Sequence, residues 1–295
     1  MNTTETASAR FSGIDDWPTA DLAAGLIESQ YAGIGAVQAA AAEIARAIDL
    51  AVARLRKGGR LVYLGAGTSG RIGTQDCVEL RPTFNWPDNR SLALMAGGRD
   101  AFLRAREGAE DSELDAVRAL EDAAVNADDV VIGLAASGRT PFTIAGLRHA
   151  RAEGALTIGL FNNPGSALGE VCEVPILLDT GAEFLAGSTR LKAGTAQKVA
   201  LNTISTSVMI RLGYVYRGLM VEMSPTNAKL HERAVGMVAK LTGADAETAR
   251  TALGQAGGNV RLATVMLALT LDRAKAEAVL AAAGGNLRIA LAWRP

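Results

Sequence analysis

The segment that decides the fold is a short apolar run followed directly by a glycine-rich loop: Arg60-Leu61-Val62-Tyr63-Leu64, then Gly65-Ala66-Gly67-Thr68-Ser69-Gly70-Arg71. The run predicts a buried strand, and the loop, which opens a predicted helix, has the spacing G-x-G-x-x-G. A helix that begins in this way can hold an anion, because its first backbone N–H groups have no partner within the helix. The spacing alone does not separate a dinucleotide from another phosphorylated ligand.

Short apolar runs alternate with helical patterns along most of the chain. The runs that we expect to form buried strands are residues 60–64, 91–95, 129–135, 157–161 and 174–178. The expected helices cover 71–80, 101–124, 141–152 and 191–212, after a long or broken helix over 21–57. This alternation predicts an α/β fold, a parallel five-stranded sheet with helices on both faces.

The pattern changes after Glu222 to short helices that contain an internal repeat. Gly257-Gly258-Asn259 recurs 27 residues later as Gly284-Gly285-Asn286. In each copy a glycine can end one helix and the asparagine can cap the next. This region resembles the helical bundle of ubiquitin-associated domains, and an interface or lid role stays open. We expect an N-terminal helical segment (1–50), an α/β ligand-binding domain (51–222) and a C-terminal helical region (223–295).

Composition argues against several classes of protein. The chain has 30 basic and 31 acidic side chains with no long run of either sign, which disfavours nucleic acid as a partner. No stretch approaches the roughly 20 uninterrupted apolar residues of a membrane span, and the first 20 residues do not resemble a secretory signal. Cys77 and Cys172 are too few for a disulfide framework or a metal cluster. We expect a cytoplasmic protein that binds neither nucleic acid nor membrane.

A second hydroxyl-rich loop, Ala136-Ser137-Gly138-Arg139-Thr140-Pro141, also follows a predicted strand and precedes a helix. Two such loops favour one phosphate and several sugar hydroxyls over a dinucleotide. The residues expected to contact them are Gly67, Thr68, Ser69, Gly70, Arg71, Ser137, Gly138, Arg139 and Thr140. Two alternatives stay open here. The hydroxyls can simply cap their helices, or the chain can be a dinucleotide-dependent oxidoreductase, although Asp88 and Asp100 are both poorly placed for a ribose.

The most specific signal is the string Gly187-Ser188-Thr189-Arg190-Leu191-Lys192-Ala193-Gly194-Thr195-Ala196-Gln197-Lys198. With the two loops, Thr4-Glu5 and Thr226-Asn227-Ala228-Lys229-Leu230, it resembles the N-acetylmuramic acid 6-phosphate etherases of the sugar isomerase superfamily. The resemblance covers nearly the whole chain. It implies the sugar isomerase fold, a homodimer, no metal or organic cofactor, and cleavage of the lactyl ether of this phosphosugar in cell-wall sugar recycling. The products would be N-acetylglucosamine 6-phosphate and D-lactate.

The resemblance also implies which residues act. The two family carboxylates correspond to Glu79, as the acid, and Glu110, as the base, although by position alone both would be ordinary helix-surface carboxylates. Glu183, Ser188, Thr189 and Lys192 look like sugar contacts, and Asn162 follows the fourth strand at the ligand-binding edge. Around Glu79, the family pattern is replaced at Val78, Leu80, Arg81 and Asn85, and Val78 and Leu80 would give the carboxyl apolar surroundings. A phosphosugar isomerase or a noncatalytic sugar-phosphate-sensing regulator is the alternative on this fold.

Overall fold

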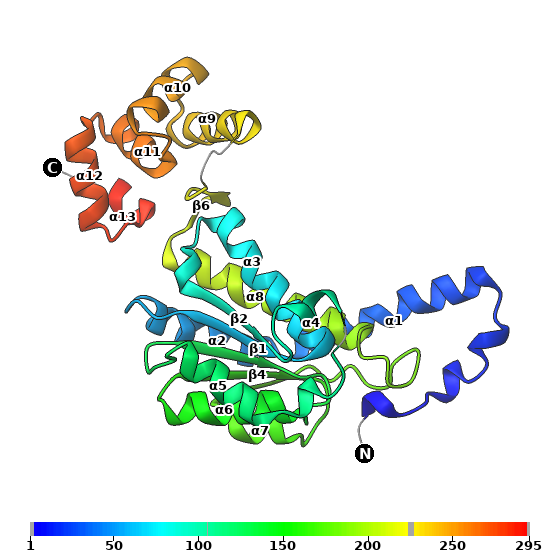
Figure 1. Ribbon diagram of the computed structural model, residues 1–295. Coiled ribbons are helices and arrows are strands. Elements are labelled where there is room, and N and C mark those ends of the chain that lie inside the picture. The colour runs from blue at the N-terminus through cyan, green and yellow to red at the C-terminus, as the bar shows by residue number, and fades with distance from the viewer. Residues whose placement is uncertain (1–2, 105, 224–226, 294–295) are drawn as a thin grey trace. The chain divides into compact units, whose positions relative to one another are not determined.

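The computed structural model describes residues 3–104, 106–223 and 227–293 (Figure 1), so Thr226 of the quoted motif lies outside the described residues. The chain divides into two compact units, Met1–Val78 with Asp88–Thr206, and Glu79–Pro87 with Ser207–Pro295. Two helices, α3 (Gly67–Phe84) and α8 (Lys192–Leu212), run from one unit into the other. The first unit includes the described residues 3–50 of the expected N-terminal helical segment.

The first unit contains the predicted parallel sheet. Its strands are β1 (Leu61–Gly65), β2 (Ser91–Met95), β3 (Val130–Leu134), β4 (Leu156–Phe161) and β5 (Val174–Leu177), in the order β2-β1-β3-β4-β5. All four pairings are parallel. The fold prediction is therefore confirmed, and the carboxyl ends of the strands lie at one edge of the sheet, where such folds bind their ligands.

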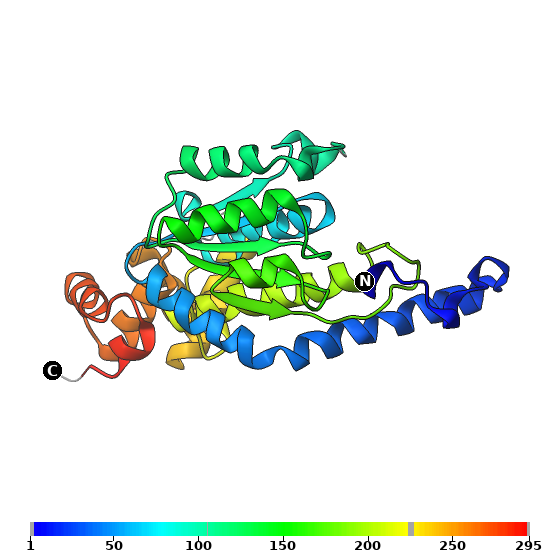
Figure 2. The same cartoon turned by 90° about the horizontal axis from the view of Figure 1, so that it is seen from below.

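Helices cover both faces of this sheet (Figure 2). On one face, α5 (Glu113–Asp122), α6 (Pro141–Ala152) and α7 (Ala167–Val171) bury a cluster that includes Val62, Leu64 and Leu147. On the other face, α2 (Ala41–Leu55) packs against β3, β4 and β5. The inner strands β1 and β3 are entirely buried because both of their faces are covered, whereas the edge strand β2 is half-buried.

A buried polar network joins β1, α3 and α8. Tyr63 alternates with Val62 and Leu64 and so points to the other face, where its hydroxyl donates to Asp76 Oδ2 at 2.7 Å. Asp76 Oδ1 accepts from Asn202 Nδ2 at 2.6 Å and from Ser205 Oγ at 3.1 Å. Burial and the neighbouring Asp76 carboxylate raise the pKa of Tyr63 well above its usual value, so the phenol stays a donor. The network holds α3 against α8 inside the first unit.

The N-terminal part is helical, as expected. Three short turns, η1 (Thr3–Glu5), η2 (Ala9–Phe11) and η3 (Ile14–Asp16), precede α1 (Thr19–Ala39), and α2 follows after a break at Ala40. An aromatic group fastens this part to a loop of the sheet domain, because Phe11 and Trp17 both contact Phe184, at ring-centroid separations of 4.5 and 6.0 Å. From that contact, α1 runs back toward the sheet, where its last turns are buried (Figure 1).

The single helix expected over residues 101–124 is wrong. The chain forms α4 (Asp100–Leu103), the turn η5 (Ala109–Asp111) and α5, while the turn η4 (Asp88–Arg90) precedes β2. Helix α4 ends because Arg104 has an extended backbone, with φ −135° and ψ 140°. Gly108 has a φ of +72° just before η5, and Ser112 begins α5 by accepting from the Asp115 N–H at 3.3 Å. The candidate base Glu110 consequently lies on a turn between helices.

The second unit contains the strands β6 (Val215–Tyr216) and β7 (Leu219–Met220) and a helical bundle. Its helices are α9 (Ala228–Thr242), α10 (Ala246–Gln255), α11 (Val260–Leu269), α12 (Arg273–Ala282) and α13 (Leu287–Leu291). Asn259 caps α11 and Asn286 caps α13, and the glycines at 257 and 284 have φ values of +63° and +59°. The repeat thus marks helix boundaries, as predicted. Across the described part of both units, every helix is too short or too polar to cross a membrane.

Candidate active site

The first glycine loop folds as a strand-to-helix turn at the carboxyl end of β1. A Cβ on Gly70 would lie 2.7 Å from the Gly65 carbonyl oxygen, so only glycine lets the two backbone segments approach this closely. Helix α3 begins at Gly67, four residues earlier than expected, and Gly67 itself has a φ of +53°. Thr68 is half-buried and Ser69 is buried in its first turn. The unpaired N–H groups of this turn are therefore presented at the ligand-binding edge.

A pocket of about 230 Å³ lies at this turn and includes the candidate base. Its lining includes Gly67, Arg71, Ala101, Arg106, Glu107 and Glu110. The structure thus brings Glu110 together with the first glycine loop, although the two are some forty residues apart in sequence.

Arg71 has a positioning contact that the sequence did not indicate. Its Nη2 donates to the Ala101 carbonyl at 2.9 Å, and its Nε donates to the Phe102 carbonyl at 3.2 Å. These carbonyls belong to α4, from which the chain continues to Glu110. Arg71, expected to bind the substrate, therefore also fastens the wall of the pocket to α3.

The second loop is equally constrained. Ser137 Oγ accepts from the Arg139 N–H at 3.2 Å, and Gly138 has a φ of +65°. Thr140 is half-buried in front of α6, where its side chain makes no cap bond to the described residues. The interpretation of Thr140 as a side-chain helix cap is thus not supported, and Arg139 is exposed.

A buried pair of opposite charges lies at the start of α8. Glu183 is 1 % exposed, and its two carboxylate oxygens accept from the Lys192 N–H at 3.2 Å and the Ala193 N–H at 2.9 Å. Burial raises the pKa of Glu183, although these two bonds and Lys192 oppose the rise. Burial also lowers the pKa of Lys192, although the nearby carboxylates of Glu183 and Asp179 favour its charged form and oppose this fall. Lys192, expected to contact the sugar, therefore also has two acidic neighbours.

Ser188 and Thr189 lie in the loop that leads into α8. Both are half-buried, and the Thr189 carbonyl accepts from the Gly194 N–H at 2.9 Å. Gly187, which precedes them, has a φ of +76°. The loop is held by its backbone, which leaves the two hydroxyls on its surface as candidate sugar contacts.

Asn162 lies in the interior, whereas the sequence suggested a ligand contact. It is completely buried, its Nδ2 donates to the Leu178 carbonyl at 2.8 Å, and its Oδ1 accepts from Gln197 Nε2 at 3.2 Å. In this conformation its amide fastens the ends of β4 and β5 to α8. Its neighbour Asn163 is also buried, and the sequence gave no sign of its partners, which include Thr3 and Thr4.

Glu79, the candidate acid, is exposed on α3. Val78 beside it is 59 % exposed and Leu80 points into the interior, so these two side chains do not enclose the carboxyl as expected. Glu79 belongs to the second unit and Glu110 to the first. Both carboxylates are accessible to a ligand, and of the two it is Glu110 that lines the pocket at the first loop.

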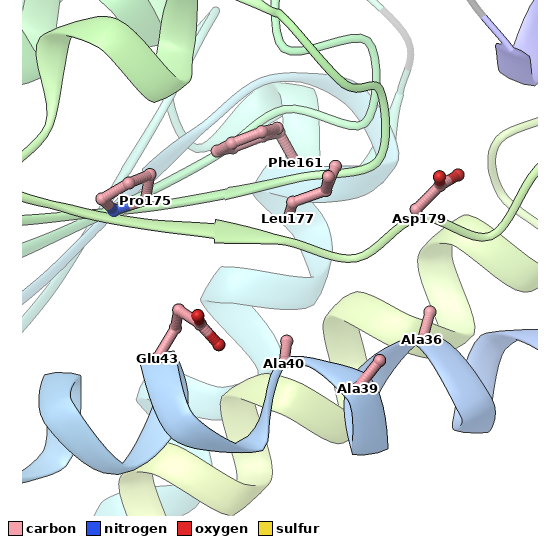
Figure 3. A pocket seen from close by; sticks show the side chains of 8 residues that line it. All are labelled: Ala36, Ala39, Ala40, Glu43, Phe161, Pro175, Leu177 and Asp179. Atoms are coloured by element: carbon pink, nitrogen blue, oxygen red, sulfur yellow. The ribbon is translucent and has the colours of Figure 1, made fainter.

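A larger cavity, of about 350 Å³, lies under the edge strand β5 (Figure 3). Phe161, Pro175 and Leu177 face α1 and α2 across it, and the carboxylates of Glu43 and Asp179 flank it. A phosphate placed here would meet two like charges on an otherwise apolar surface, which is unfavourable. This cavity is therefore a poor candidate for the sugar-phosphate site.

Comparison with known proteins agrees with this geometry. Residues 43–151 match the glucokinase regulatory protein N-terminal SIS domain, and residues 111–207 match the SIS domain. The chain is 50% identical over 273 residues to an N-acetylmuramic acid 6-phosphate etherase of Deinococcus radiodurans, covering 92% of this chain and 90% of that one. It is 45% identical to one of Mycolicibacterium smegmatis, with 90% and 89% covered.

A solved structure shows the same fold. The Escherichia coli CFT073 protein c3406 superposes with a TM-score of 0.50 at 18% identity, covering 68% of this chain and 97% of that one. The fold and the paired loops define a protein of the sugar isomerase class. Within that class, the chain belongs to the N-acetylmuramic acid 6-phosphate etherase family.

Proposed function

We propose that this protein cleaves the lactyl ether of N-acetylmuramic acid 6-phosphate to N-acetylglucosamine 6-phosphate and D-lactate, a carbon–oxygen lyase reaction of cell-wall sugar recycling. The observation that carries the proposal is the pocket at the end of β1, where Glu110 lies beside the first turn of α3. A helix N-terminus suits a phosphate, and a carboxylate next to it suits proton abstraction from the sugar. The etherase relatives give the reaction that combines them.

The chemistry requires one base and one acid. Opening the sugar ring exposes an aldehyde at carbon 1, which acidifies the hydrogen on carbon 2. The base removes that proton, a double bond forms between carbons 2 and 3, and the carbon 3–oxygen bond of the ether breaks. The acid protonates the departing lactate oxygen. Water then adds to carbon 3 and a proton returns to carbon 2. Each well-placed proton transfer contributes about 10² to 10⁴ in rate.

We assign the base to Glu110 and the acid to Glu79. Glu110 is supported by its place in the pocket that Gly67 and Arg71 also line. Glu79 is supported by the family resemblance of the segment around it and by its accessibility to a ligand. Among the residues that the structure describes, neither carboxylate forms an ion pair.

The remaining polar groups would bind the phosphate and the sugar hydroxyls. Hydroxyl candidates are Thr68, Ser69, Ser137, Thr140, Ser188 and Thr189. Gly70 and Gly138 shape the two loops, because a side chain on either would collide with Gly65 or Ser166, and Arg139 is exposed. Glu183 fixes the start of α8 by accepting from the Lys192 and Ala193 N–H groups, and the Lys192 side chain stays a candidate sugar contact.

A homodimer is supported by a stripe of exposed apolar side chains on α1. Ile27, Tyr31 and Ile34 are 65, 72 and 46 % exposed and recur at helical spacing along one side of the helix. A second copy would cover this surface, so I27S/I34S should convert a dimer to a monomer in sedimentation analysis. A cytoplasmic location fits the two buried cysteines, which are unpaired.

The proposal is tested by measuring D-lactate released from N-acetylmuramic acid 6-phosphate. Lactate is expected from the wild type, and Glu79→Gln and Glu110→Gln should each retain phosphosugar binding and lose turnover by at least about 10². Glu113→Gln is the matched control, an exposed carboxylate on α5 that does not line the pocket, and should keep most of the activity. Folded protein that binds the phosphosugar but releases no lactate would instead indicate the isomerase or the regulator.

A further inference from the structure

The segment around Thr4 is fastened to the carboxyl edge of the sheet by a single asparagine. Asn163 is 2 % exposed, and its Nδ2 donates to Thr4 Oγ1 at 3.0 Å and to the Ala136 carbonyl at 2.9 Å. Its Oδ1 accepts from Thr3 Oγ1 at 3.0 Å and from the Thr4 N–H at 3.2 Å. A primary amide offers two N–H donors and two acceptor positions, so all four are used. Thr4 itself is completely buried.

The same segment also reaches the loop before α8. The Thr4 carbonyl accepts from the Gly187 N–H at 2.9 Å. The Glu5 carboxylate lies where a side chain on Gly187 would project, with Oε2 2.8 Å from that Cβ position. A residue other than glycine at 187 would therefore displace Glu5.

Each of these contacts is made to a backbone group of the residue just before a candidate sugar-binding serine. Ala136 immediately precedes Ser137, and Gly187 immediately precedes Ser188. Thr4 and Asn163 thus connect the backbone of the second hydroxyl-rich loop, at Ala136, with the backbone of the loop that contains Ser188, about fifty residues further along the chain. The sheet itself does not need this connection, because its strands pair directly with one another.

We propose that Thr4 and Asn163 form a clamp that positions the Ser137 and Ser188 loops for the phosphosugar. Both are positioning residues, because each acts through the loops and neither touches the ligand. The proposal rests on the proposed function, since it takes those two loops as the binding surface. Ligand groups held within about 1 Å of their productive place are sensitive to such supports, and a misplacement of that size costs up to about 10² in rate.

The test is Thr4→Val, which keeps the size of the side chain and removes its hydroxyl. We expect affinity for N-acetylglucosamine 6-phosphate, measured by calorimetry, to fall at least about tenfold, and kcat/KM for lactate release to fall with it through a higher KM. Thr4→Ser should restore both. The matched control is Thr157→Val, because Thr157 is also completely buried and accepts one hydrogen bond, from the Glu173 N–H at 3.0 Å, but lies near the amino end of β4. It should lose stability and keep its affinity.

Amide hydrogen exchange gives a readout that does not depend on turnover. Thr4→Val should speed exchange in residues 136–140 and 185–189 together, while Thr157→Val leaves both unchanged. If Thr4→Val fails to fold, Thr3→Val, which removes one bond to the same amide, should show smaller changes in the same direction. Wild-type binding without lactate release would count against the etherase activity and leave the clamp testable. Unchanged exchange and affinity in the folded Thr4 variant, or equal losses in Thr157→Val, would overturn the clamp.

Discussion

Gly138→Ala should lower the free energy of unfolding by more than the left-handed backbone conformation of Gly138 alone would cost. Gly138 has a φ of +65°, and a Cβ there would lie 2.2 Å from Ser166 Oγ and 2.4 Å from Ser166 Cβ. Ser166 is 4 % exposed and has little room to move. The left-handed conformation costs about 1 kcal/mol for alanine, and overpacking of this kind costs a further 1 to 3 kcal/mol or so. We therefore expect a loss of about 2 to 4 kcal/mol in the free energy of unfolding of the first unit.

Two further variants separate these contributions. Gly181 has nearly the same φ, +66°, and no atom within 4 Å of its Cβ position, so Gly181→Ala should lose only about 1 kcal/mol. Adding Ser166→Gly to Gly138→Ala removes the obstructing atoms and should recover most of the difference in a double-mutant cycle. Urea unfolding measures stability, and lactate release measures the loop's function. The reasoning is refuted if Gly138→Ala and Gly181→Ala are equally stable, or if the double variant recovers nothing.

Two other predictions concern charged groups of the first unit. Arg60 donates to both carboxylate oxygens of Asp129. Burial alone would raise the pKa of Asp129, but these bonds and backbone N–H donors outweigh burial and lower it. This stabilisation is present above the ordinary aspartate pKa, about 4, and is lost as pH falls through the lowered value. Urea unfolding at pH 7 and pH 3 should therefore show a smaller acid-induced loss in Asp129→Asn than in the wild type, whereas the exposed Asp128→Asn should behave as wild type. Arg71→Lys replaces a planar fork that bonds two carbonyls, so we expect kcat to fall about tenfold or more while KM changes by less than about threefold; a rise in KM with unchanged kcat would show that Arg71 acts only as a ligand.

The fold could be predicted from the sequence because its strands carry their own signal. Both β1 and β3 are entirely buried, since both faces of the sheet are covered, and each is followed by a glycine loop and a helix. The prediction failed between β2 and β3, at residues 101–124, where the mixture of apolar and charged residues is typical of a single helix. There the extended backbone of Arg104, the left-handed Gly108 and the capping Ser112 break the helix despite its propensity.

The site could be predicted only where its residues are local in sequence. The two hydroxyl loops have recognisable spacing, and the carboxylates came from a resemblance. The long-range contacts had no such signal: Asn163 meets Thr4 across 159 residues, and Arg71 reaches carbonyls of α4 that any residue would supply. Asn162 and Asn163 have equivalent positions after a strand, and only the packing around them shows which partners each one binds.

Lactate release from N-acetylmuramic acid 6-phosphate in water enriched in oxygen-18, with both products analysed by mass spectrometry, tests the assigned reaction itself. Elimination followed by addition of water breaks the bond between carbon 3 and the ether oxygen. We therefore expect label at one oxygen of N-acetylglucosamine 6-phosphate and none gained by lactate from the cleavage. Absence of lactate would contradict the assigned activity, and label in the lactate hydroxyl would contradict the proposed course of the reaction.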